Sequence, residues 1–133
     1  MKYSKKQKSQ IIKKLIEKWR PILFLGEWTI SHKYVDNYGP KSEQVKDADA
    51  AAEIFVNYPY KLAHITTYNG FWEKDSDTQD SMLCHELCHC HTQELWDIST
   101  DFANGKYTTP DHVWKAVETL TQRISIIAKH GNK

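Results

Sequence analysis

The stretch Cys84-His85-Glu86-Leu87-Cys88-His89-Cys90-His91 decides how the rest of this chain is interpreted. It contains the spacing His85-Glu86-x-x-His89. Positions four apart lie on one face of a helix, so two imidazoles at this spacing can hold one metal ion, and the Glu between them leans toward the same opening. The stretch therefore predicts a helix that carries a metal site.

The alternative is a pair of core histidines that bind no metal. Between residues 82 and 93 the only formally charged side chain is Glu86, and apolar residues occur on several sides of the helix. Such a pattern is typical of a buried helix. A buried carboxylate without a nearby Lys or Arg is costly unless a metal, a water or a reacting proton uses it. We therefore favour the metal site and expect the helix to be buried.

Composition sets the limits of this interpretation. With 133 residues the chain is expected to form a single domain, residues 1–133, with a hydrophobic core. The net charge is +1, yet residues 1–20 hold eight Lys or Arg and one Glu, which gives that segment a charge of +7. Such a segment is either a solvated helix face or an arm that binds nucleic acid.

Cysteine content and hydropathy indicate the compartment. Three cysteines within seven positions do not form a disulfide framework, which points to a reducing environment. No apolar run has the length of a membrane span, and no export signal is visible. We therefore expect a cytoplasmic protein without a membrane partner, and a monomer.

The expected elements follow from hydrophobic periodicity and from helix boundary signals. Helical spacing of apolar residues predicts a helix over residues 5–20 that ends before Pro21, and alternation predicts strands over residues 28–34, 50–58 and 60–68. Loops are expected over residues 36–47 and 97–109. The central helix is expected to run from an acidic start within 73–80 to about Trp96. The last helix is expected to run from Thr109-Pro110-Asp111 to about Lys129. The fold class is therefore α+β: a small mixed or antiparallel sheet of about three strands, packed on an N-terminal helix, the central HExxH helix and a C-terminal helix.

Catalytic zinc usually has three protein ligands and one position open to water, so a third ligand is needed. Our choice is Glu118, because it lies at the margin of the apolar stripe of the last helix and can face the interior. The alternative is an exposed Glu118 that pairs with Lys115 or Gln122. Other candidates for the third ligand are Asp97, Asp101, Asp111, His112, Glu94 and His91. His91 is unfavourable because it points about 160° around the helix from His89.

Other potential ligands have simpler interpretations. Cys84, Cys88 and His91 share a helix face, so a structural zinc site is conceivable, but cysteine on a buried helix usually acts as a small hydrophobe. His32 and His64 are interpreted as strand residues that face solvent or the sheet.

The order of a helix, strands, an HExxH helix and a closing helix resembles small zincin metallopeptidases, specifically the minimal gluzincin-like domains that include phage and prophage metallopeptidases. Only His85-Glu86-x-x-His89 is a specific motif, and the region of Glu118 lacks the Asn-Glu-x-x-x-Asp pattern of large gluzincins. The resemblance implies one zinc ion per chain, held by His85, His89 and Glu118, with Glu86 as general base. It also implies a protein or peptide substrate, which pairs in an extended form with the strand at residues 62–68 at the edge of the cleft.

The implied reaction is metal-assisted hydrolysis, in which Glu86 takes a proton from water and passes it to the leaving amine. Tyr107 and His112, near the start of the last helix, are candidates for a second oxyanion donor. Two other functions are compatible with the sequence. A DNA-associated zincin of the SprT-like type would use the basic segment and a third His, either His112 or His130. A non-catalytic interaction module would have its zinc site closed by Cys88 or by a second carboxylate.

Overall fold

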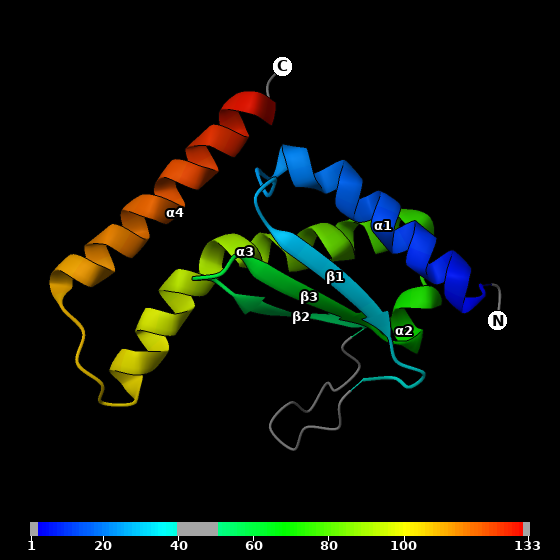
Figure 1. Cartoon of the computed structure of the whole chain (residues 1–133), viewed down its shortest axis with the longest axis horizontal. Helices are drawn as coiled ribbons and strands as arrows, with labels where there is room; N and C mark the ends of the chain where they lie inside the picture. Colours follow the sequence, from blue (N-terminus) through cyan, green and yellow to red (C-terminus); the bar gives the residue numbers. More distant parts are fainter. Residues whose placement is uncertain (1–2, 40–50, 132–133) are drawn as a thin grey trace.

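The computed structural model describes residues 3–39 and 51–131 and shows a mixed α+β fold, as expected. The elements, in chain order, are α1 (Lys5–Ile22), β1 (Thr29–Tyr34), β2 (Ala52–Asn57), β3 (Leu62–Thr67), α2 (Asn69–Trp72), α3 (Ser76–Ala103) and α4 (Pro110–Gly131). Figure 1 shows α1 and α3 beside the sheet, and α4 extending away from the strands. Most of the loop predicted over 36–47, and the first residue of the strand predicted over 50–58, lie outside the described residues.

The described strands form one mixed sheet with the order β1-β3-β2. β3 pairs with β1 in parallel, with Ala63 beside Ile30, and with β2 in antiparallel, with Ile65 beside Ile54. The strand at residues 62–68 was expected to pair with an extended substrate, and that expectation is wrong. Because both sides of β3 are hydrogen-bonded to neighbouring strands, an extended substrate cannot pair with it; the outer strands are β1 and β2.

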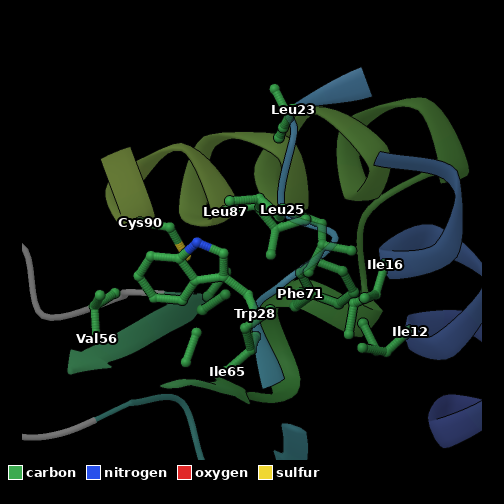
Figure 2. Close-up of a cluster of buried hydrophobic side chains, with 14 of the residues drawn as sticks. Ile12, Ile16, Leu23, Leu25, Trp28, Val56, Ile65, Phe71, Leu87 and Cys90 are labelled. Carbon is green, nitrogen blue, oxygen red and sulfur yellow. The ribbon is translucent and has the colours of Figure 1, made fainter. Parts of the chain in front are cut away.

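The hydrophobic core lies between one face of the sheet and the helices. Figure 2 shows Ile12 and Ile16 of α1, Ile65 of β3 and Leu87 of α3 together with Trp28 in this cluster. The packing of the N-terminal helix against the sheet is therefore confirmed. The helix itself continues through Pro21 to Ile22, two residues beyond the predicted end, because Leu23 N still donates a hydrogen bond to Trp19 O at 2.8 Å.

α3 differs from expectation in its length and in its burial. It begins after the N-cap Asp75, within the predicted acidic start, but it runs to Ala103, so the loop predicted from residue 97 is wrong over 97–103. This last part of α3 leaves the core, with Trp96 and Phe102 exposed, and a helix without a buried face has no apolar periodicity to detect. The expectation of a helix buried on all sides is also wrong, because His85 and Cys88 are exposed.

α4 starts at Pro110, as predicted, but packs through little of its apolar stripe. Ala116 is its only buried residue among those described, and Ile127 packs against the core. Arg123 donates a hydrogen bond to the hydroxyl of Tyr58 at 2.8 Å, which ties the second half of α4 to the end of β2. Val113, Trp114, Val117 and Ile124 remain exposed.

His32 gives the fold a pH dependence that can be tested. Its Nε2 lies 2.8 Å from Thr67 Oγ1, which also accepts a hydrogen bond from Trp72 Nε1 at 3.1 Å. Burial, and secondarily the charge of His64, lowers the pKa of His32 to about 4. The unfolded chain, with a His pKa of about 6.5, therefore binds this proton more readily than the folded chain does. The contribution of neutral His32 to stability is complete above pH 6.5 and is lost as the pH falls toward 4.

When the pH falls from 7 to 5, we expect the free energy of unfolding of His32→Gln to decrease by about 1 kcal/mol less than that of wild type. This value is discounted for the partial exposure of the ring. Gln keeps a hydrogen-bonding group near Thr67 but does not titrate. The measurement is urea denaturation of both proteins at the two pH values. An equal loss of stability in wild type and variant would show that the pKa of His32 is the same in the folded and the unfolded chain.

Candidate metal centre

The start of α3 is fixed by an N-cap, by a contact with α1 and by two buried leucines, and the last two of these set its rotation. Asp75 accepts a hydrogen bond from Thr78 N at 2.8 Å and so caps the helix. Asp80 accepts from Trp19 Nε1 at 2.6 Å, which joins α3 to α1. Leu83 and Leu87 are completely buried. With this face against the core, residues 85 and 89 are turned outward.

His85 and His89 are neighbours on the exposed face of α3. Their ring centroids are 5.1 Å apart and their planes meet at 81°. The prediction that positions 85 and 89 share one face is thereby confirmed. Burial, and then the adjacent His85, lowers the pKa of His89. A lowered pKa favours the neutral imidazole, which is the form that binds a metal ion.

Glu86 lies between the two histidines in sequence and is half-buried. Burial raises the pKa of Glu86, His85 lowers it, and the negative charge of Glu53 raises it. Desolvation and a nearby carboxylate both disfavour the charged form of this side chain. A carboxyl group whose pKa lies above its usual range accepts a proton near neutral pH more readily, which suits a general base that later acts as an acid.

Glu53 and Tyr68 are parts of this region that sequence reasoning missed. Glu53 is on β2, and Tyr68 directly follows β3. The hydroxyl of Tyr68 donates a hydrogen bond to Glu53 Oε1 at 2.5 Å, and burial together with this bond raises the pKa of Tyr68 to about 12. No sequence motif links the two residues to Glu86. They meet because β2 lies beside α3, an arrangement that depends on strand order.

Glu118 is not brought to the two histidines. Across residues 3–39 and 51–131, no group of three His, Cys, Asp or Glu side chains is placed to hold a metal ion. Ala116 is 2% exposed and faces the protein, and Glu118 is two positions later, about 200° around the helix. Glu118 is exposed. Its role as third ligand stays a prediction.

Several rival ligands have partners elsewhere. Nε2 of buried His91 lies 2.6 Å from Leu23 O, to which it must donate because a carbonyl only accepts. Burial lowers the pKa of His91, and the bond to Leu23 partly offsets this effect. The three aspartates of the same set contact neighbours along the chain: Asp97 accepts from Gln93 at 2.8 Å, Asp101 lies 3.5 Å from Lys106 Nζ, and Asp111 lies 3.2 Å from Lys115 Nζ. Glu94 is half-buried on α3, and His112 is exposed on α4.

The cysteines do not assemble a structural site in the part of the chain that is described. All three thiols are free. Burial, and then Cys88, raises the pKa of Cys84 to about 11, and burial raises that of Cys90 to about 12. Burial thus disfavours the thiolate form of both side chains. His91, the third member of the conceivable Cys84, Cys88 and His91 site, donates to Leu23 O instead.

The predicted oxyanion donors, Tyr107 and His112, are both exposed, and their role stays a prediction. Tyr107, in the connection between α3 and α4, is 91% exposed. The backbone N of His112 donates to Thr109 Oγ1 at 3.1 Å, so His112 belongs to the start of α4, and its side chain is exposed. The two strand histidines are where they were predicted: His64 Nδ1 lies 2.7 Å from Ser31 Oγ, and His32 contacts Thr67.

An apolar groove adjoins the histidine pair. It has a volume of about 460 Å³. Its lining comes from the outward face of α3 and consists of His89, Thr92, Gln93, Leu95, Trp96 and Ser99. Figure 1 shows that the ribbon of α3 changes direction along its second half. His89 thus belongs both to the histidine pair and to the wall of this groove.

None of the described helices is long and apolar enough to cross a membrane. Comparison of the chain with protein-family models, with curated proteins and with solved structures gave no match.

Proposed function

We propose that this protein is a zinc-dependent peptidase that hydrolyses peptide bonds in a protein or peptide substrate. One observation carries the proposal: two adjacent imidazoles, His85 and His89, face outward on α3, and half-buried Glu86 lies between them in the motif. His89 also lines an apolar groove of about 460 Å³. The two imidazoles, completed by the carboxylate of Glu118 as third ligand, would make a set that suits zinc.

The roles of the protein groups follow from their chemistry. A zinc ion bound here supplies a water of lowered pKa and polarises the scissile carbonyl. His85 and His89 hold the ion as neutral ligands. Glu86 accepts the proton from the attacking water and then donates it to the nitrogen of the leaving amine. The raised pKa of Glu86 supports both steps, because the proton has to be held between them.

The outer strand β2 is the edge that we propose for the substrate backbone. β2 packs beside α3, and its far side has no partner strand among the described residues. An extended peptide can add to such an edge through main-chain hydrogen bonds. Glu53 on this strand influences Glu86 electrostatically, which places β2 on the side of the motif.

We propose Glu118 as the third protein ligand, and metal content tests the whole site. Wild type should contain about one zinc ion per chain, and His89→Ala and Glu118→Ala should lose it, because removing one of three ligands abolishes tight binding. Glu53→Ala is the matched control, a carboxylate near Glu86 that should be dispensable for metal. The measurement is zinc per chain by elemental analysis after dialysis.

The outcomes of this measurement separate the possible sites. Zinc retained in Glu118→Ala but lost in Glu53→Ala would move the third ligand to β2. Absence of zinc from wild type, even after zinc is added back, would contradict the peptidase proposal. Retention by His89→Ala would contradict the histidine pair itself.

The basic N-terminal segment offers less support for a DNA-associated function than its charge suggests. Lys8 is 1% exposed, with its ammonium 3.7 Å from the centroid of the Tyr34 ring, and Lys18 pairs with Asp80. These two cations therefore contribute to the fold. The test is a variant in which Gln replaces Lys5, Lys6, Lys13 and Lys14. If wild type binds DNA in a salt-sensitive manner and the variant does not, the DNA-associated function is favoured over the peptidase.

A further inference from the structure

We propose that two copies of this chain associate through α4, with the exposed apolar stripe of one copy packed in antiparallel against the same stripe of the other. A monomer is the expectation from the sequence, and the exposure of this stripe is what argues for a dimer instead. Although α4 has 22 residues, Ala116 is its only buried residue among those described. The proposal depends neither on metal nor on peptide cleavage.

The stripe follows from helix geometry and from the exposure of its side chains. At about 100° per residue, Val113, Val117, Ile124 and Ala128 lie within about 60° of one another, and Trp114 lies about 40° further round. All five are exposed, Trp114 to 61% and Ile124 to 56%. Figure 1 shows α4 extending away from the strands. Single exposed apolar residues are ordinary, but a continuous row along a helix is typical of an interaction surface.

A second copy fits the stripe because the row is complementary to itself. When two α4 helices run antiparallel about a twofold axis near residues 120–121, Val117 lies opposite Ile124 of the second copy, and Val113 lies opposite Ala128 of the second copy. A twofold axis makes each contact twice, so the same row is covered in both copies. Apolar surface that is exposed in the monomer is thereby removed from water, which stabilises the pair.

Charged side chains near the two ends of α4 favour the antiparallel orientation. Asp111 and Lys129 are both exposed, and they lie on the same side of the helix because their separation of 18 positions is about five full turns. In the antiparallel pair, Asp111 lies beside Lys129 of the second copy, at both ends of the contact. A parallel pair would instead place like charges together, which is unfavourable. Asp111 also lies 3.2 Å from Lys115 Nζ, in an exposed pair that a second cation can join.

The length of the stripe indicates a reversible dimer. From residue 113 to residue 128 the row covers about four turns, or about 22 Å. One helix pair of this length is a small contact, and small interfaces are typical of complexes that form and dissociate readily. We therefore expect the balance between monomer and dimer to change with protein concentration.

Sedimentation velocity over a range of protein concentrations measures the association. Wild type should shift from monomer to dimer as the concentration rises. Val117→Glu and Ile124→Glu should each weaken the dimer at least about 10-fold, because a carboxylate would lose hydration in the apolar contact. Phe55→Glu is the matched control: Phe55 is 68% exposed on β2, outside α4, and its replacement should leave the dimer unchanged.

A charge exchange tests the antiparallel orientation with exposed residues, whose replacement leaves the core intact. Asp111→Lys and Lys129→Glu each bring like charges together at both ends of the contact, and each should weaken self-association about fivefold. In an equal mixture of the two variants, the mixed dimer again pairs opposite charges at both ends. The mixture should therefore associate about as tightly as wild type.

Three results would overturn the proposal. Wild type that stays monomeric at every concentration would leave the stripe to a different partner. A dimer that keeps its full affinity in both Val117→Glu and Ile124→Glu would place the contact on another surface. Charge variants that associate as tightly as wild type by themselves, or a mixture no tighter than either variant alone, would contradict the antiparallel pairing.

Discussion

Glu86→Gln is expected to retain about one zinc ion per chain and to lower peptide cleavage by about 10²–10⁴-fold, the usual contribution of a general acid and base. Gln has nearly the size and shape of Glu, so the helix and the histidine pair should persist. It cannot accept the proton of the attacking water. The measurement is the initial rate of peptide cleavage together with zinc content, for the variant and the wild type.

Glu94→Gln is the matched control for this substitution, because Glu94 is also half-buried on α3 but lies outside the motif. It should cleave at nearly the wild-type rate. If Glu86→Gln also retained the full rate, Glu86 would not be the base. If it lost its zinc, the loss of activity would be explained by the metal, and the assignment of the base would fail this test.

Leu87→Ala is expected to lower the free energy of unfolding by about 2–5 kcal/mol, the range for removing a large aliphatic side chain from a packed core. Leu87 has 0% exposure and lies in the cluster shown in Figure 2 with Trp28 and Phe71. The loss combines reduced burial of apolar surface with the cavity left behind. Urea denaturation of wild type and variant measures it.

Cys88→Ala is the matched control, because Cys88 is the next residue but is exposed. Its effect should stay within about 0.5 kcal/mol, as for most surface substitutions. Comparable losses in both variants would contradict the rotation of α3 that turns residue 87 inward and residues 85 and 89 outward. The two variants therefore test the orientation of the histidine pair without reference to metal.

The residues behind the two large effects, Glu86 and Leu87, are consecutive on the same helix and lie about 100° apart around it. Leu83 and Leu87 anchor α3 in the core, and His85 and His89 project from the other side. The helix holds the imidazoles beside each other, and the buried leucines turn the pair outward before any ligand arrives. Preorganisation of this kind reduces the entropy that metal binding would otherwise cost.

Local features of the chain were predictable from the sequence because they depend on neighbours within a few positions. The adjacency of His85 and His89 follows from helix geometry alone and is observed. The start of α3 after Asp75 and the start of α4 at Pro110 follow from the chemistry of helix N-termini. The burial of Ile12 and Ile16 on one side of α1 follows from their spacing.

Other features were decided only by the tertiary structure. Strand pairing decided the central place of β3 and the position of Glu53 near Glu86. The packing of α4 decided the exposure of Glu118. Even the length of α3 was hidden, because its second half leaves the core and carries no periodic burial. The sequence by itself determined the helix that carries the histidine pair, since positions four apart always meet on a helix. Only long-range packing decided what surrounds that pair, because contacts between distant segments leave no local pattern in the chain.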